Sequence, residues 1–188
     1  SSLNLGYVKN KVTKSNITPQ AQNLVKSVYT PGEVYLGKPV NGMFSYRFAE
    51  LDADGMPLFY DQDNNKLNAD DTELPTAVFS NIENLKYEGT RDPILTGGFN
   101  NVIKYKEFTL SFLFSFGLKN VIRLPEYAYN SSPSDDQNAN RRIMERWRKP
   151  GDEENTWVPK PLHGSFNYTF QNVVDGSDKQ LEKGNMIR

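Results

Sequence analysis

The stretch Phe108-Thr-Leu-Ser-Phe-Leu-Phe-Ser-Phe116 decides the fold of this 188-residue chain. Its residues alternate between two faces, as in a β-strand. One face carries the large apolar residues Leu110, Phe112, Phe114 and Phe116. The other carries Thr109, Ser111, Ser115 and Gly117, interrupted by Leu113. The wet face of a soluble sandwich usually holds charged residues. A small, uncharged second face instead suits the inner wall of a wide barrel whose Phe-rich face meets lipid.

The residues before this strand predict its partner. Gly97–Tyr105 is a second strand candidate, and the two-residue step Lys106-Glu107 separates the two arms by the spacing of a β-hairpin. Lys-Glu is not among the residue pairs that favour hairpin turns. Two lysines and two aromatic residues gather beside this step, where the interfacial girdle of a barrel would lie: Lys104, Lys106, Tyr105 and Phe108.

Three further segments show the same alternation: Leu3–Tyr7, Met43–Glu50 and Gly164–Asn172. We expect long connections between strands, an acidic loop at Asp52–Asp71 and a proline-rich loop at Leu124–Pro161. Alternately short and long connections are typical of outer-membrane barrels. The expected fold is therefore all-β: a portion of a large antiparallel transmembrane β-barrel with long extracellular loops.

Helix is expected only in short pieces. A helical turn follows Pro19, and a short helix lies within one long loop at Asn140–Lys149. In that helix the charged residues face solvent while three apolar residues pack inward: Ile143, Met144 and Trp147. Pro75–Thr90 is interpreted as a connection.

The composition excludes several classes of function. A net charge of −1 gives no support for nucleic-acid binding, and the absence of cysteine excludes thiolate metal sites and Cys nucleophiles. The single histidine, His163, has no Gly-x-Ser-x-Gly motif to pair with, and no glycine-rich phosphate loop is present. Nothing therefore indicates an enzyme or a cofactor.

The acidic loop carries a partial calcium pattern. Asp61, Asp63 and Asn65 match positions 1, 3 and 5 of an EF-hand loop. The match then fails, because Lys66 replaces the turn glycine and Thr72 stands where the bidentate glutamate belongs. A solvated turn is the preferred interpretation, and no residue is assigned to a metal site.

Four aromatic residues of the proline-rich loop are the candidate substrate-binding residues: Trp147, Trp157, Tyr127 and Tyr129. Exposed rings on such a loop can stack on the apolar faces of sugars. The preferred alternative is that they pack the loop against itself or against the barrel rim, since a long loop needs a core of its own.

The stretch Arg91-Asp-Pro-Ile-Leu-Thr-Gly-Gly-Phe-Asn-Asn-Val-Ile-Lys-Tyr-Lys-Glu-Phe-Thr-Leu-Ser-Phe-Leu-Phe-Ser-Phe-Gly resembles a barrel hairpin of SusC/RagA-type TonB-linked outer-membrane transporters. Three further segments resemble that family in the expected order. They are Gly37–Phe48 with Leu51–Phe59, the pair Arg146-Trp147 before a proline-rich loop, and Asp178–Arg188.

This resemblance implies a plugged barrel in the bacterial outer membrane of Bacteroidetes. Such a barrel imports oligosaccharides or peptides with the help of TonB and a SusD-like surface lipoprotein, and its wall contacts outer-membrane lipid. Residues 1–188 would be part of the C-terminal half of the barrel domain, without the plug and the closing strands. The alternative function is a soluble or surface-exposed β-domain that binds glycans through its aromatic residues, and an enzyme such as a glycan-active hydrolase comes third.

Overall fold

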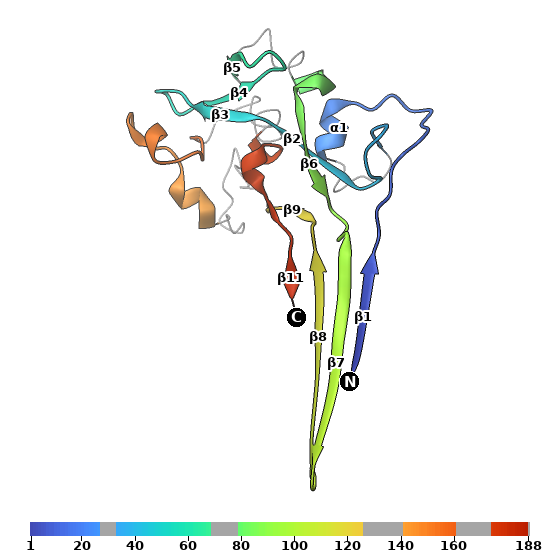
Figure 1. Ribbon diagram of the computed structural model, residues 1–188. Helices are drawn as coiled ribbons and strands as arrows, with labels where there is room; N and C mark the ends of the chain where they lie inside the picture. Colours follow the sequence, from blue (N-terminus) through green and yellow to red (C-terminus); the bar gives the residue numbers. More distant parts are fainter. Residues whose placement is uncertain (27–32, 69–78, 126–140, 161–173, 188) are drawn as a thin grey trace, which may run out of the picture.

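The computed structural model describes residues 1–26, 33–68, 79–125, 141–160 and 174–187. Most of the ordered elements are β-strands, and all the strand pairs within sheets are antiparallel. Figure 1 shows two parts: a long, narrow sheet and a compact group of short elements at one end of it. We call the long sheet the wall and the compact group the cap.

The wall has four strands in the order β1-β7-β8-β11. Their bounds are Ser2–Tyr7 for β1, Leu95–Tyr105 for β7, Phe108–Leu118 for β8 and Met186–Ile187 for β11. β7 and β8 pair along their whole length, from Leu95 opposite Leu118 to Tyr105 opposite Phe108. The hairpin predicted at Lys106-Glu107 is therefore confirmed. Its tip projects away from the cap (Figure 1).

The long paired strands explain why the turn at the tip tolerates Lys106-Glu107, a residue pair that hairpin turns do not favour. Lys106 has a φ of 52°, in the left-handed region that glycine or asparagine usually occupies. Eleven residue pairs fix the register of the two arms, so the sheet holds this conformation in place.

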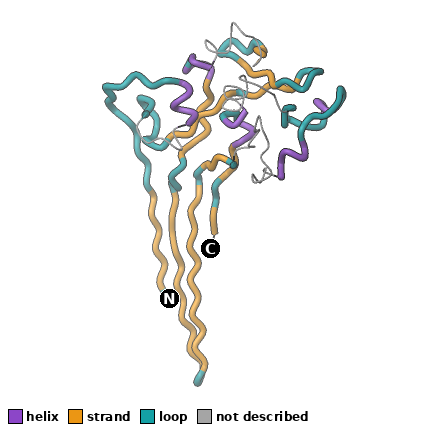
Figure 2. The backbone as a smooth tube through the Cα atoms, turned by 180° about the vertical axis from the view of Figure 1, so that it is seen from behind, coloured by secondary structure: helices purple, strands orange, loops and turns teal. Residues whose placement is uncertain are grey.

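The cap contains three small sheets. β2 (Gly42–Tyr46) pairs with β6 (Leu85–Thr90), and β9 (Val121–Arg123) pairs with β10 (Leu181–Lys183). The third sheet has the order β3-β4-β5, with bounds Phe48–Leu51, Pro57–Tyr60 and Lys66–Asn68. Figure 2 shows that the helical elements of the chain lie in the cap, beyond the long strands. They are α1 (Ala21–Lys26) and the 3-10 turns η1 (Ile82–Asn84), η2 (Arg141–Glu145), η3 (Asp152–Glu154) and η4 (Asp178–Gln180).

Aromatic side chains form the main core of the cap. Phe59 and Phe79 are almost completely buried and pack edge to face at 5.8 Å between ring centroids. Tyr46 packs against Phe79 at 5.0 Å and donates its hydroxyl to the Phe79 carbonyl oxygen. Burial raises the pKa of Tyr46, so its hydroxyl stays protonated as a donor. A second cluster contains Met56, Val158 and Val174.

Backbone and side-chain hydrogen bonds join the C-terminal part of the chain to β2. The Arg123 guanidinium donates to the carbonyl oxygens of Phe44, at 2.7 Å, and Asp175, at 2.8 Å. The Tyr46 amide donates to the Gly176 carbonyl oxygen at 2.9 Å. Since the chain runs on from Asp175 through β10 to β11, these contacts tie the cap to the last strand of the wall.

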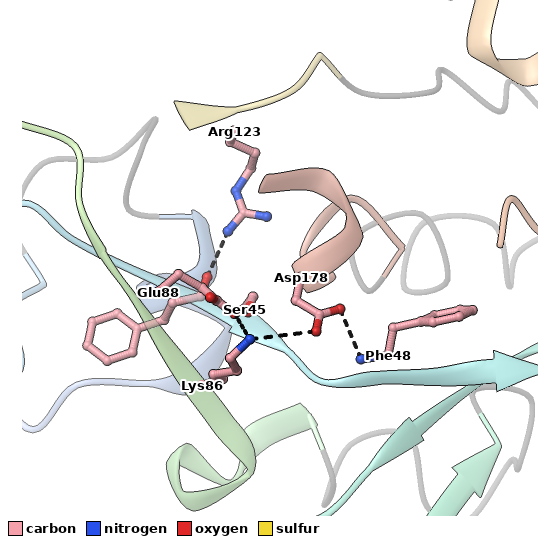
Figure 3. Close-up of polar contacts among 7 residues, drawn as sticks. Ser45, Phe48, Lys86, Glu88, Arg123 and Asp178 are labelled. Carbon is pink, nitrogen blue, oxygen red and sulfur yellow. Dashed lines mark hydrogen bonds and ion pairs between the residues drawn. The ribbon is translucent and has the colours of Figure 1, made fainter. Parts of the chain in front are cut away.

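A chain of charged side chains extends this connection (Figure 3). Glu88 accepts a hydrogen bond from the Ser45 hydroxyl and forms an ion pair with Lys86. The Lys86 Nζ also lies 4.0 Å from Asp178 Oδ2. The other oxygen of Asp178 accepts the Phe48 amide at 3.2 Å. Burial raises the pKa of the Asp178 carboxyl in spite of these partners.

The predicted acidic loop is instead a folded β-meander. Asp52 closes the turn between β3 and β4, and Asp61 closes the turn between β4 and β5. In each turn the aspartate Oδ1 accepts the amides two and four residues later, those of Asp54 and Met56 or of Asp63 and Asn65. The fourth residue is left-handed in both turns, with a φ of 75° at Gly55 and 64° at Asn64. This is a three-residue hairpin loop, used twice.

Three other predictions need correction. Met43–Glu50 is two strands of the cap rather than a barrel strand, because all five residues of β2 are buried. The connection predicted at Pro75–Thr90 contains β6. Of the helix predicted at Asn140–Lys149, the described residues form only the 3-10 turn Arg141–Glu145, and Met144 points outward with 61% of its surface exposed.

The helical turn predicted after Pro19 is confirmed by α1. Leu3–Tyr7 is confirmed as a strand of the wall. The strand predicted at Gly164–Asn172 lies outside the described residues. Within the described ranges, no helix is both long and apolar enough to cross a membrane.

Candidate membrane-facing wall and cap groove

The wall has one apolar face, and the strand register determines which residues form it. Residues directly opposite each other in neighbouring strands share a face. Phe114 lies opposite Phe99, which lies opposite Leu3, so these three side chains are on the same side. The same rule gives the apolar residues of the face: Leu3, Leu5, Tyr7, Leu95, Phe99, Ile103, Tyr105, Phe108, Leu110, Phe112, Phe114, Phe116, Leu118 and Ile187. Gly97 and Asn101 are the exceptions on this side.

Most of the large residues of this face are exposed, and none of them is buried. Leu5 is 66% exposed, Leu110 is 60% exposed and Phe108 is 79% exposed. Monomeric soluble proteins rarely leave so many contiguous apolar side chains in water, because each buried CH₂ group is worth about 0.8 kcal/mol. The face is therefore a surface that meets another apolar phase.

The opposite face is small and polar. It carries Ser2, Asn4, Gly6, Thr96, Gly98, Asn100, Lys104, Thr109, Ser111, Ser115 and Gly117, with Val102, Leu113 and Met186 as the apolar exceptions. The alternation predicted for Phe108–Phe116 therefore extends over all four strands. Such a two-sided sheet can separate an apolar phase from a wet one.

Gly97 leaves room on the apolar face for the ring of Phe116. A Cβ on Gly97 would overlap the ring of Phe116, its cross-strand partner, and would lie 2.8 Å from the Asn4 carbonyl oxygen. Phe116 covers the backbone that Gly97 leaves bare, an arrangement that stabilises glycine in a strand. This contact explains why a residue with low strand propensity occupies the middle of the wall.

The end of the wall away from the cap carries aromatic and basic groups. Tyr105 and Phe108 pair across the hairpin and are both exposed. The Lys106 Nζ lies 5.5 Å from the centroid of the Tyr105 ring, within the range of a cation–π contact. These are the residues that the sequence predicts for an interfacial girdle.

Trp147, a candidate substrate-binding residue, packs against the cap meander. Its indole ring lies on Gly55, where any side chain would overlap it. Its Nε1 donates to a carboxylate oxygen of Glu153 at 3.0 Å, and its amide donates to the Val158 carbonyl oxygen at 2.8 Å. The Glu153 pKa is lowered, first by backbone hydrogen bonding and then by this indole.

Trp157 lies between the second core cluster and a groove. Its ring packs edge to face on Phe48 at 6.4 Å, and the Arg142 guanidinium lies 5.3 Å from its centroid. A groove of about 630 Å³ adjoins it. The groove is lined by Met144, Glu145, Arg146, Arg148, Lys149, Asp152, Asn155, Thr156 and Trp157.

The other two candidates, Tyr127 and Tyr129, lie outside the described residues. No cluster of three or more potential metal ligands occurs in the part of the chain that the structure describes. Asp61, the first position of the calcium-like pattern, uses Oδ1 for two backbone amides and Oδ2 for the Asn65 side chain. The sequence missed the cationic groove, although the dense basic residues of Arg141–Lys149 were the signal for it.

Comparison with known proteins relates this chain to a transporter by structure. No family model and no curated protein matches it. It is similar to a solved structure of the RagAB peptide transporter, with 20% identity over 81% of this chain and a TM-score of 0.51. It is also similar to the RagAB peptide importer in the 'open-open' and 'closed-closed' states. These matches each cover 99% of this chain, with identities of 18% and 19% and TM-scores of 0.61 and 0.60.

The chain spans less than a fifth of the length of those structures, at 16%, 18% and 19%. At such low identity the likeness shows the fold alone. It confirms an antiparallel, all-β segment with the fold of part of a β-barrel transporter. The described strands do not themselves close into a barrel, since β1 and β11 are the edges of the wall.

Proposed function

We propose that this chain is part of the barrel of an outer-membrane, TonB-dependent nutrient importer. The observation that carries the proposal is the two-sided wall, with an exposed apolar face on one side and small polar residues on the other. That division is the one a lipid-facing and lumen-facing barrel strand requires. The structural likeness to the RagAB importers supports the same function.

The wall has the length of a membrane crossing. β7 and β8 each contain eleven residues. At about 3.4 Å per residue such a strand is about 37 Å long. A tilt of about 40° reduces its height to about 28 Å, close to the apolar band of about 25 Å that outer-membrane barrels present. Residues 1–188 are thus proposed to be a portion of the barrel domain.

The hairpin and the cap are assigned to opposite sides of the membrane. We assign the tight turn at Lys106-Glu107 to the periplasmic side, because periplasmic turns are short, and the cap to the extracellular side. A SusD-like lipoprotein and the nutrient, an oligosaccharide or a peptide, would meet the cap. TonB would act on a plug elsewhere in the transporter, so no residue of this chain is proposed to do chemistry.

Single-cysteine labelling in the outer membrane tests the wall. These 188 residues contain no cysteine, so a single one can be placed in turn at Phe112, Ser111, Phe114 and Ser115 of a whole transporter whose remaining residues are also cysteine-free. A water-soluble maleimide should label positions 111 and 115. A lipid-soluble spin label at 112 and 114 should show contact with lipid acyl chains.

The expected period of two distinguishes the wall from the soluble alternative. Uniform labelling by the aqueous reagent would contradict the membrane-facing wall and would favour a surface-exposed glycan-binding domain. Protection of both faces would indicate that the sheet is buried in protein.

A further inference from the structure

The cap groove lies on residues 144–157, a segment whose shape is held by hydrogen bonds. The Thr156 hydroxyl donates to the Glu145 carbonyl oxygen at 2.6 Å, and the Arg148 guanidinium donates to the Met144 carbonyl oxygen at 2.8 Å. The Trp147 amide bonds to Val158, which belongs to a buried core cluster. These bonds anchor both sides of the segment, so the groove lies on a preorganised surface.

The charges along the groove are unbalanced. Three cations line it, Arg146, Arg148 and Lys149, beside the carboxylates of Glu145 and Asp152. The lining therefore has one more cation than carboxylates, and the Asp152 Oδ2 is held in place by the amides of Arg148 and Lys149 at 3.1 Å each. In the described part of the chain no carboxylate forms an ion pair with any of the three cations.

The groove also has apolar surface. Met144 is an exposed side chain within it, and the Trp157 ring forms part of its lining. Its volume of about 630 Å³ lies within the range of ordinary small-ligand sites, about 300–1,000 Å³. Cations beside an aromatic ring and a thioether suit a ligand that is anionic at one point and apolar at another.

We propose that this groove binds the carboxylate of a short oligomeric nutrient. Arg146, Arg148 and Lys149 would contact the carboxylate, and the body of the ligand would lie on Trp157 and Met144. Two sources carry that chemistry, an acidic peptide and a uronic-acid oligosaccharide. The inference rests on the proposed importer function and specifies which nutrients that importer would select.

Binding by the intact transporter in detergent tests the proposal. The probes are a six-residue peptide with two aspartates and a free C-terminus, the same peptide with asparagines and an amidated C-terminus, a uronic-acid trisaccharide, and its neutral counterpart. Titration calorimetry gives each Kd, and Trp157→Phe shows whether this ring contributes. We expect the acidic member of at least one pair to bind more tightly by about fivefold or more, and more weakly at high salt.

Charge-removal variants locate the site. Arg148→Gln with Lys149→Gln should weaken the acidic probe by about threefold to tenfold and its neutral counterpart much less, since each exposed ion pair is worth up to about 1 kcal/mol. Loss of the Arg148 bond to the Met144 carbonyl oxygen would instead weaken both probes alike. Lys149→Gln alone should weaken it by less and should leave the segment intact, because no described hydrogen bond uses the Lys149 side chain. The matched control, Lys9→Gln with Lys11→Gln, removes the same charge at exposed positions outside the groove and should change nothing.

Equal affinity for the acidic and neutral members of both pairs would overturn the proposal, and so would equal losses in the groove and control variants. Neither result would touch the importer function, which the period-two labelling of the wall tests separately. If the peptide pair discriminates and the sugar pair does not, the nutrient is an acidic peptide. The reverse result identifies an acidic oligosaccharide.

Discussion

Phe114 in the wall and Phe59 in the cap are the same residue in the same kind of antiparallel strand, yet Phe114 is 52% exposed and Phe59 is 1% exposed. The other aromatic residues follow the same division: those of the cap core are buried, and those of the wall are exposed or half-buried. The cap surrounds its aromatic rings with other side chains, whereas the wall directs its rings outward. The cap therefore provides its own apolar phase, and the wall depends on one outside the chain.

Phe59→Ala should give the largest effect. Phe59 contacts both Tyr46 and Phe79, and removing a buried phenylalanine side chain costs about 3–5 kcal/mol. The cap should become sensitive to proteolysis at denaturant concentrations that the parent protein resists. The same truncation at Phe114 should leave cap proteolysis unchanged. Equal sensitivity in the two variants would abolish the distinction between the regions.

Phe114→Arg tests the wall in the membrane. A cation on the lipid face near the middle of a barrel strand costs about 2–4 kcal/mol, so the fraction of folded transporter in the outer membrane should fall sharply. Leu113→Arg is the matched control, because the adjacent side chain points to the polar face. If Leu113→Arg reduced assembly as much as Phe114→Arg, the two faces would have been assigned wrongly.

Gly97→Ala should have a smaller effect within the wall. The added methyl group must displace the Phe116 ring, and such overpacking costs about 1–3 kcal/mol. At Gly98, on the other face, an added Cβ meets the flexible Asn4 side chain at 3.0 Å, so Gly98→Ala should cost less. Unfolding of the transporter in detergent by denaturant measures both variants, and a larger loss at Gly98 would contradict the packing described.

The two aspartates Asp61 and Asp178 predict small and opposite effects of pH on the cap. Hydrogen bonding, first from the Asn65 side chain, lowers the Asp61 pKa below its usual 3.8. Its contribution to stability is therefore present above pH 3.8 and is lost as the pH falls through the lowered value. Burial raises the Asp178 pKa above 3.8. Its contribution to stability is therefore greatest below pH 3.8 and falls as the pH rises from 3.8 through the raised pKa, because the unfolded chain ionises Asp178 more easily.

Proteolysis of the cap as a function of pH measures these effects. Asp61→Asn should make the loss of cap stability at falling pH smaller. Asp178→Asn should remove the loss of cap stability at rising pH. An unchanged pH profile in Asp61→Asn would show that its carboxylate contributes nothing to the turn.

The wall was readable from the sequence because its two environments differ strongly. Leu110, Phe112 and Phe114 alternate with Thr109, Ser111 and Ser115, interrupted only by Leu113, so a single strand reveals both its period and its two faces. The two-residue step at Lys106-Glu107 then fixed the hairpin, although the turn residues are poor. The resemblance of Arg91–Gly117 to SusC/RagA transporters predicted the same segment.

The cap was harder to predict because its strands are short and because one of them, β2, is buried on both sides. β2 shows alternation in Phe44 and Tyr46, yet Ser45 on its other face is also buried, held by Glu88. Alternation alone cannot distinguish that arrangement from a barrel strand. β6 was missed because Leu85–Thr90 includes Lys86, Glu88 and Gly89 and because its pairing strand, β2, comes from a distant part of the chain. The cationic groove likewise depends on which carboxylates are already engaged, and this only the folded chain reveals.

The two aspartate turns have a consequence for how this surface can evolve. Asp52 and Asp61 each bond to amides within their own turn, so most of the hydrogen bonds that shape a corner lie inside five consecutive residues. The turn at Asp61 can therefore be lengthened or exchanged with little effect on strands elsewhere, whereas the turn at Asp52 is fixed by the Trp147 ring that packs on Gly55. On the proposed function, selection for a new nutrient could change the Asp61 turn of the cap while the strands of the wall keep their register.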